Sequence, residues 1–91
     1  MHKVEHANEA DYFIIGVVVG VLKLEDGNFD VKIDRSENTV AYWFWSRQVH
    51  LQGDLHLVEK LIKSHFDDNI RCNALPNLRT FYIIISRTPK K

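Results

Sequence analysis

The sequence is poor in the residues that staple or bend a chain: its 91 residues include one cysteine, two prolines and four glycines. The lone cysteine, Cys72, cannot form an internal disulfide, which favours a reducing compartment. A chain of this length has only a modest hydrophobic core to stabilise it. The apolar run Tyr12–Leu22 is about half as long as a membrane-spanning helix. We therefore expect one domain over residues 1–91, with flexible tails at 1–7 and 87–91 and no membrane partner.

A surplus of basic residues is also missing, because 12 Lys and Arg stand against 12 Asp and Glu. Phosphate neutralisation drives most of the affinity of free-standing DNA and RNA binders, so these proteins are usually basic. Basic residues do gather near the C-terminus, where an acid-free segment carries Arg79, Arg87, Lys90 and Lys91.

The patterns typical of metal and nucleophile sites are absent as well. Histidines occur at positions 2, 6, 50, 56 and 65, but none has metal-ligand spacing with a cysteine or carboxylate set. Cys72 lacks a nucleophile context, so we interpret it as a core or strand residue. We therefore expect no bound metal, no cofactor and no small-molecule substrate.

The first segment begins with a helix-start signal. Asn8 can accept a hydrogen bond from an unsatisfied backbone N–H, and Asp11, three residues on, can return one. The valines and isoleucines of Tyr12–Leu22 favour a strand, whereas the length and the cap favour a buried helix. Gly16 and Gly20 would lie on one face of that helix and would let a second backbone approach closely.

A long hairpin is expected next. Three apolar residues alternate with three charged ones, which predicts a half-buried strand: Phe29, Val31 and Ile33 against Asp30, Lys32 and Asp34. After the polar turn Arg35–Thr39, the segment Val40–Val49 predicts a second strand. One of its faces carries Tyr42 and Phe44, and the other carries Trp43 and Trp45.

The second half repeats this order. Gly53-Asp54 starts a helix whose apolar side is predicted from Leu55, Val58, Leu61, Ile62 and Phe66. A short strand Ile70–Cys72, a turn Ala74–Asn77 and a last strand Arg79–Ser86 follow. The sequence thus predicts an α+β domain of order αββαββ, with an antiparallel sheet and both helices packed on one face.

This order resembles the LAGLIDADG homing-endonuclease family over nearly the whole chain. The segment Phe13–Gly20 is similar to the family's phe-leu-ala-gly-phe-ile-asp-gly, and both Gly16 and Gly20 match. In that family the helix packs against its twin through small residues, its end delivers an acidic metal ligand, and the hairpin lies along the DNA major groove. The resemblance implies that Gly16 and Gly20 form such an interface.

The sequence departs from the family where the chemistry would be. In this register the family's two acids fall on Val19 and Val21, and valine cannot supply the oxygen that a hard cation needs. In an alternative register Asp26-Gly27-Asn28-Phe29 matches the family's asp-gly-ser-phe, and Asp26, or Glu25, would hold magnesium. The helix that closes the domain in the family also has no counterpart in this sequence. We therefore expect part of one sheet face to be exposed and available to a partner.

Candidate nucleic-acid contacts come from the hairpins and the C-terminal end. We expect phosphate contacts from basic residues, with Tyr42 in the outward set: Lys32, Arg35, Tyr42, Arg47, Arg79, Arg87, Lys90 and Lys91. Tyr42, Trp43 and Trp45 could stack on unpaired bases at about 1–3 kcal/mol each, or serve as core and sheet cover. Asp30 and Asp34 share the face of Lys32 and would repel phosphate, so reading of duplex sequence is not expected.

These observations predict a catalytically inactive LAGLIDADG-like subunit, nucleic-acid-binding or structural, of a larger ribonucleoprotein such as an organellar ribosome. Its partners would be structured RNA, neighbouring proteins or both. Acids at Glu5, Glu9 and Asp11 make the N-terminal stretch unlike a secretory signal or transit peptide. A mitochondrial location would then imply synthesis inside the organelle, and a cytoplasmic location is the alternative.

Two other functions remain open. The chain could be a magnesium-dependent homing endonuclease that cuts DNA as a homodimer through the Gly16 and Gly20 face, with Asp26 or Glu25 as ligand. It could also be a maturase that binds intron RNA, which the sequence does not separate from the first interpretation.

Overall fold

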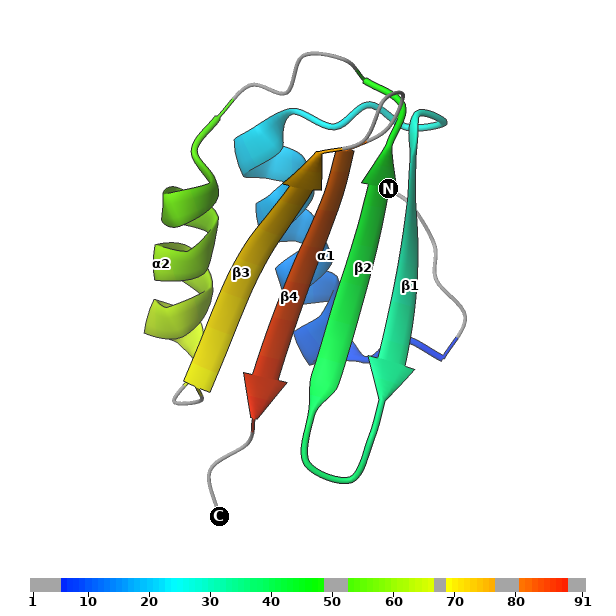
Figure 1. The fold of residues 1–91 in the computed structure, drawn as a ribbon. Helices are drawn as coiled ribbons and strands as arrows, with labels where there is room; N and C mark the ends of the chain where they lie inside the picture. Colours follow the sequence, from blue (N-terminus) through cyan, green and yellow to red (C-terminus); the bar gives the residue numbers. More distant parts are fainter. Residues whose placement is uncertain (1–5, 49–52, 67–68, 77–80, 89–91) are drawn as a thin grey trace.

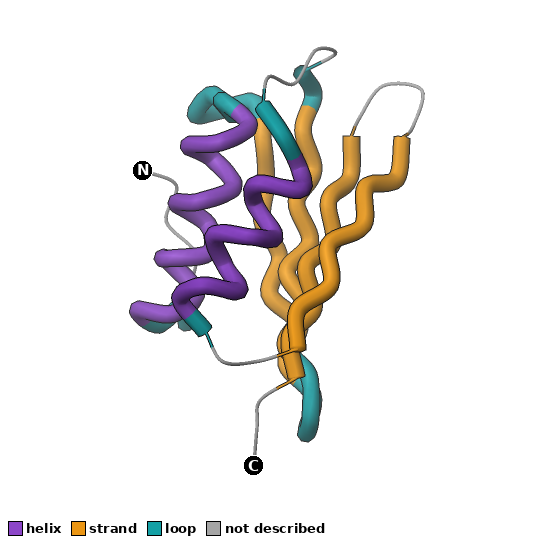
Figure 2. Tube along the Cα trace, turned by 90° about the vertical axis from the view of Figure 1, so that its left-hand side faces the viewer, coloured by secondary structure: helices purple, strands orange, loops and turns teal. Residues whose placement is uncertain are grey.

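The computed structural model describes residues 6–48, 53–66, 69–76 and 81–88. Its elements follow in the order α1 (Glu9–Leu22), β1 (Phe29–Arg35), β2 (Val40–Ser46), α2 (Leu55–His65), β3 (Asn69–Pro76) and β4 (Phe81–Thr88). The strands form one four-stranded antiparallel sheet with the order β1-β2-β4-β3 (Figure 1). Both helices lie on the same face of the sheet (Figure 2). The predicted α+β fold and its αββαββ order are confirmed.

Helix α1 resolves the ambiguity of the valine-rich segment in favour of a helix. The side chain of Asn8 accepts from the backbone N–H of Asp11 at 2.9 Å, and the Asn8 N–H donates to the Asp11 carboxylate at 2.9 Å, so the predicted capping box is present. One face of the helix is buried in the core and carries Ile14, Ile15, Val18 and Leu22. The cap and this apolar face together outweigh the strand propensity of the β-branched residues.

The hairpin register puts alternate residues of β1 and β2 under the helices. Val31 pairs with Phe44 and Ile33 pairs with Tyr42, and the two aromatic side chains are fully buried. Strand β4 adds Ile83 and Ile85 to the same side. We call this the helix side of the sheet; the intervening residues point to the other face.

Strands β3 and β4 differ from the sequence prediction at their ends. Residues 74–76 belong to β3, so the turn predicted from Ala74 was wrong. Pro76 is the last residue of an edge strand, where a missing N–H breaks no ladder across the sheet. Strand β4 runs to Thr88, so Arg87 lies in the sheet and not in a tail.

Helix α2 rests on the edge of the core between α1 and β3. Its N-cap Asp54 accepts from the N–H of His56 at 2.8 Å, and its residues Val58 and Ile62 are fully buried. Leu61, predicted on the buried side, is 39% exposed instead. The ring of Phe13 from α1 stacks on His65 with centroids 3.8 Å apart, which joins the two helices at the end of α2.

A buried polar network joins α1 to three strands. The Asp11 carboxylate is fully buried and is paired with the guanidinium of Arg35 at the end of β1. Its Oδ1 accepts from the Tyr42 hydroxyl of β2 at 2.7 Å, and that hydroxyl accepts from Nε of Arg87 of β4 at 3.4 Å. No buried side-chain polar atom of the described residues is left without a partner.

The network sets the charge states of its members. Burial alone would raise the pKa of Asp11, but hydrogen bonds from Arg35, from the Asn8 N–H and from Tyr42 together hold that pKa below 3.8. Burial raises the pKa of Tyr42 to about 12, so its hydroxyl keeps its proton and donates. The carboxylate is therefore the charged acceptor at neutral pH.

The first prediction concerns Asp11 and pH. Because its folded pKa is lowered, Asp11 stabilises the fold above its ordinary pKa of 3.8, and this stabilisation is lost as pH falls through the folded pKa. Asp11→Asn should lower the free energy of unfolding at neutral pH by roughly 1.5–3 kcal/mol, the range for hydrogen bonds to a charged group. Urea unfolding from neutral to acid pH measures the difference, which should shrink on acidification. Asp34→Asn, an exposed carboxylate on β1, should change little at any pH.

The second prediction concerns Gly53, just before α2. Its φ is 114°, and a Cβ there would lie 1.9 Å from the carbonyl oxygen of Val21. Gly53→Ala should therefore lower the free energy of unfolding by about 3–4 kcal/mol, from backbone strain and a backbone clash together. Gly27 has φ 86° but open space around it, so Gly27→Ala should lose only roughly 1 kcal/mol. If chemical unfolding shows that Gly53→Ala and Gly27→Ala lower the free energy of unfolding equally, the close approach of Gly53 to the Val21 carbonyl is contradicted.

Candidate nucleic-acid interface on the open sheet face

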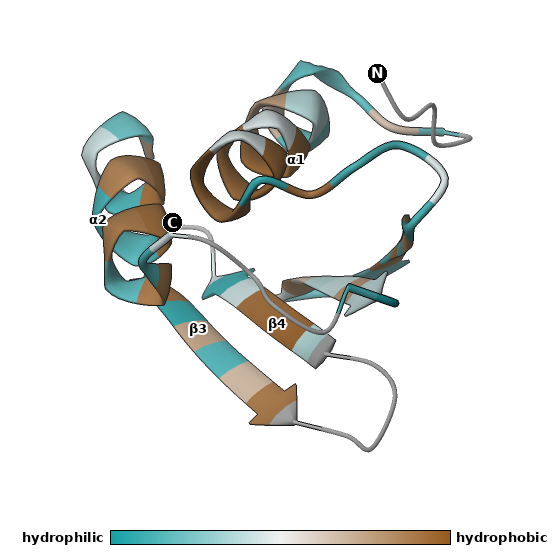
Figure 3. Cartoon of the chain, turned by 90° about the horizontal axis from the view of Figure 1, so that it is seen from above, coloured by the Kyte–Doolittle hydropathy of each residue, from teal (hydrophilic) through white to brown (hydrophobic). Residues whose placement is uncertain are grey.

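One face of the sheet carries no helix (Figure 2). Hydrophilic and hydrophobic residues alternate over the first part of β3 (Figure 3), and burial alternates with a period of two in β1 and β2. We call this uncovered surface the open face; its residues are Asp30, Lys32, Asp34, Ala41, Trp43, Trp45, Asn69, Arg71, Asn73, Leu75, Tyr82, Ile84, Ser86 and Thr88. No described element covers it.

The middle of the open face is aromatic and apolar. Trp45 pairs with Tyr82 across β2 and β4, and their rings meet edge to face with centroids 5.9 Å apart. Trp43 pairs with Ile84 in the next row. All four side chains are half-buried by their neighbours on the sheet, and Leu75 beside Tyr82 is 49% exposed. The sequence left open which aromatic pair of β2 is core and placed Tyr42 in the outward set; the structure puts Trp43 and Trp45 on the open face instead.

Charges on the open face lie at its two edges. On β1, Lys32 stands between Asp30 and Asp34, and Asp30 pairs with Arg47 at 3.4 Å in an exposed contact. On β3, at the opposite edge, Arg71 is exposed and makes no ion pair with any residue that the structure describes. The β1 edge is thus neutral overall, whereas the β3 edge is positive.

Three of the predicted contacts point the wrong way. Tyr42, expected in the outward set, is fully buried on the helix side beside Phe44. Arg35 and Arg87, expected to touch phosphate, also lie on the helix side and belong to the Asp11 network. Arg35 continues the inward series of Phe29, Val31 and Ile33 by the period of two, so this placement follows from the strand itself.

The other predicted contacts divide into two groups. Lys32 lies on the open face, and the Arg47 side chain reaches that face through Asp30. Arg79, Lys90 and Lys91 lie outside the described residues. Sequence analysis missed Arg71, although its alternation with the inward residues Ile70 and Cys72 could have revealed an outward position.

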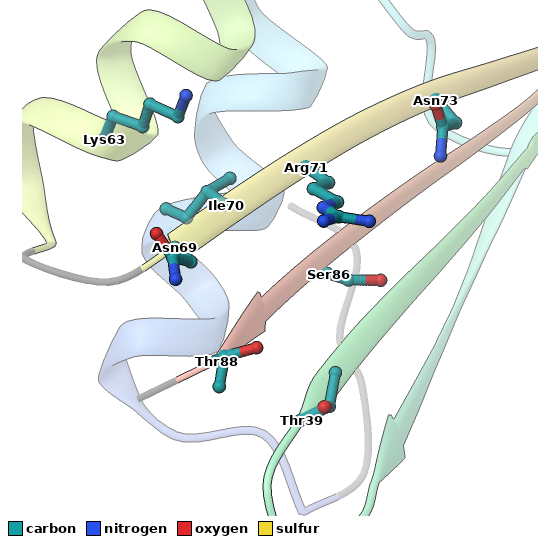
Figure 4. A pocket seen from close by; sticks show the side chains of 8 residues that line it. All are labelled: Thr39, Lys63, Asn69, Ile70, Arg71, Asn73, Ser86 and Thr88. Atoms are coloured by element: carbon teal, nitrogen blue, oxygen red, sulfur yellow. The ribbon is translucent and has the colours of Figure 1, made fainter. Parts of the chain in front are cut away.

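A polar pocket of about 540 Å³ lies at the β3 side of the open face (Figure 4). Its lining comes from β3, β4, α2 and the turn before β2 and consists of Thr39, Lys63, Asn69, Ile70, Arg71, Asn73, Ser86 and Thr88. Ser86 pairs directly with Arg71, and Thr88 pairs with Asn69. The lining therefore joins hydroxyl and amide groups to two cations, with no carboxylate among them.

The alternative catalytic residues lie in a tight turn after α1. The Asn28 N–H donates to the Glu25 carbonyl at 3.0 Å, Gly27 has a positive φ, and the Asn28 amide donates to the Glu25 carboxylate at 3.2 Å. The Glu25 carboxylate is thereby used within the turn, and both Glu25 and Asp26 are exposed. Within the described part of the chain, no three His, Cys, Asp or Glu side chains come together as a metal site.

The end of α1 is apolar and covered. Val19 and Val21 are half-buried, and Gly53 lies against the Val21 carbonyl. Gly16 lies one turn earlier on α1 and Gly20 lies between the two valines in sequence; a Cβ at either position would meet nothing within 4 Å. No described residue therefore packs closely against either glycine, and the interface with a second helix stays a prediction.

Cys72 lies on the helix side of β3, half-buried, and its backbone N–H donates to the Glu59 carboxylate at 3.2 Å. Burial, with a smaller effect of the nearby Glu59 charge, raises the pKa of the Cys72 thiol to about 12. The thiol is therefore protonated at neutral pH and is a poor nucleophile.

Among the helices of the described residues, none combines the length and apolarity that crossing a membrane requires.

The comparisons with known proteins leave the family open. The chain matches no protein-family model, no curated protein and no solved structure. The resemblance to the LAGLIDADG family therefore stays a prediction, while the αββαββ fold rests on the structure of the chain itself.

Proposed function

We propose that this chain is a non-catalytic nucleic-acid-binding subunit of a larger ribonucleoprotein, and that its open face binds unpaired bases of structured RNA. The observation that carries the proposal is the position of both tryptophans of the chain on the uncovered face, next to Tyr82. Aromatic side chains on an open sheet stack with any base, because every base presents a π-face.

The balance of charge agrees with this mode of binding. Duplex binders hold the phosphate backbone over many contacts, and their affinity comes largely from released counterions. The middle of the open face offers Trp43, Trp45 and Tyr82 in place of a basic stripe. Stacking at about 1–3 kcal/mol for each base reaches useful affinity without a net positive charge.

Two observations support a non-catalytic role. Valine stands at both positions of α1 where the resemblance would place an acid, and neither side chain can coordinate magnesium. The start of α2 also packs against the last turn of α1 at Gly53, so that end of the helix is not open to a phosphodiester. The endonuclease alternative must instead use Asp26 in the exposed turn.

The third prediction tests the open face directly. Single-stranded oligouridylate added to the purified protein should quench its tryptophan fluorescence, since both tryptophans lie on this face. Trp43→Ala and Trp45→Ala should each weaken binding by about 5–100-fold, the range for one lost base stack. Leu57→Ala, which removes an exposed apolar side chain of α2, should bind as the wild type does.

Binding that survives both tryptophan substitutions in an unaltered fold would contradict the proposal. Far-ultraviolet circular dichroism of each variant separates loss of binding from loss of structure. A blunt duplex of the same length should bind more weakly than the single strand; tighter binding to the duplex would favour the major-groove mode of the alternative.

The fourth prediction concerns the assembly. We place the subunit in an organellar ribosome or a similar particle inside mitochondria, because a chain of balanced charge needs protein contacts to share the work of binding. Gradient fractionation of native extract should find the chain in a large particle, and ribonuclease treatment should shift it to lighter fractions. A free monomer or a homodimer at the top of the gradient would contradict the assembly and favour the dimeric endonuclease.

A further inference from the structure

We propose that the polar pocket at the β3 side of the open face is a phosphate site, which holds a phosphodiester of the same RNA strand whose bases stack on Trp43 and Trp45. The inference rests on the proposed function. It adds a phosphate contact to the base stacking and gives the bound RNA strand an orientation across the sheet. Sequence analysis assigned no role to the pocket or to Arg71.

Most of the lining residues lie on the open-face side of β3 and β4, whereas Ile70 and Lys63 lie on the helix side of β3 (Figure 4). Figure 4 shows Arg71 on β3, with Ser86 and Thr88 on β4 and Thr39 before β2, along the same side of the sheet. Arg71 and Ser86 are direct partners in the β3–β4 register. A guanidinium beside hydroxyl groups is the combination that binds phosphate oxygens, because the guanidinium supplies two parallel donors and the hydroxyls donate further.

The charge of the pocket favours an anion. Lys63 of α2 also lines it and is paired with Glu59 at 3.7 Å, whereas Arg71 has no ion pair among the described residues. On the open face, the cross-strand row that contains Arg71 runs through Ser86 and Ala41 to Asp34 on β1, which is three strands away, or roughly 14 Å at the usual spacing. A carboxylate at that distance is largely screened at physiological salt.

The pocket lies next to the aromatic surface. Ile84 pairs with Trp43 on one side and with Asn73 on the other, and Ser86 follows Ile84 on the same face of β4. Two residues along a strand span roughly 7 Å, which is comparable with the reach of a nucleotide from its base to its phosphate. A strand with its bases on β2 and β4 can thus place a phosphate at the β3 edge.

The opposite edge is unsuited to the same contact. Lys32 on β1 is flanked by Asp30 and Asp34, and Arg47 is already paired with Asp30. Phosphate oxygens at that edge would meet carboxylates as well as cations. The charge distribution therefore orients the backbone of the bound strand toward β3 and its bases toward β2.

The salt dependence of binding tests this assignment, which is the fifth prediction. Tryptophan quenching by oligouridylate is titrated over a series of salt concentrations for the wild type, Arg71→Gln, Arg71→Lys, Trp43→Ala and Lys60→Ala. Each phosphate contact to a single strand contributes about 0.7 to the slope of log K against log salt. Arg71→Gln should bind about tenfold more weakly and lose about that much slope.

The other variants separate charge from geometry. Arg71→Lys keeps the charge but loses the paired donors, so it should recover part of the slope and little of the affinity. Trp43→Ala should lose affinity with the slope unchanged, because stacking releases no counterions. Lys60→Ala is the matched control: it removes an exposed cation of α2, away from the pocket lining, and should change neither quantity.

The outcomes distinguish the two proposals. If the wild type binds and Arg71→Gln keeps the affinity and slope of the wild type, the phosphate site is wrong and the stacking surface stands. If the wild type binds no oligonucleotide, the proposed function fails and the phosphodiester assignment fails with it. Inorganic phosphate is the second probe: a free anion that binds at Arg71 but does not compete with oligouridylate would overturn the placement of the RNA strand in the pocket.

Discussion

The carboxylate of Asp11 fixes how α1 lies on the sheet. It holds Arg35 of β1 and Tyr42 of β2 directly, and it reaches Arg87 of β4 through the Tyr42 hydroxyl. A buried ion pair adds little net stability over an apolar contact, but breaking one partner is costly, so such a network selects one arrangement over others. Here it ties the N-terminal turn of α1 to β1 and β2, on the face of the sheet where Phe29, Phe44 and Ile83 are buried.

The composition of the open face follows from the same network. Two of the sheet's cations and one tyrosine hydroxyl are turned inward to satisfy Asp11, so they cannot serve a ligand. The open face is left with an aromatic middle that contains Trp43 and Trp45, a β1 edge whose charges balance, and Arg71 on β3, which has no ion pair among the residues that the structure describes. A protein of zero net charge thereby obtains one positive edge without a basic surface.

The sequence predicted the order of elements because each element carries its own local signal. The capping box at Asn8 and Asp11 and the alternation in Phe29–Asp34 depend on near neighbours alone, and both appear in the structure. The site was harder to predict than the fold. Its residues were chosen by chemical type, and the alternation of strand residues, which turns Arg35 and Tyr42 inward, was not applied. The bond between Tyr42 and Arg87 joins positions 45 residues apart, and only the β2–β4 register brings them together. Arg71 could have been placed outward from its alternation with Ile70 and Cys72, but its pairing with Ser86 is set by the β3–β4 register.

The covered end of α1 bears on the proposed non-catalytic role. A metal-dependent nuclease needs an oxygen ligand at a position that a phosphodiester can reach. At this helix end the side chains are valines, and the loop before α2 occupies the space beside the Val21 carbonyl, where only glycine fits. Replacing Val21 with an acid would therefore supply a carboxylate without opening a path for the substrate. The proposed binding on the open face does not involve that helix end, because the helices lie on the opposite face of the sheet (Figure 2).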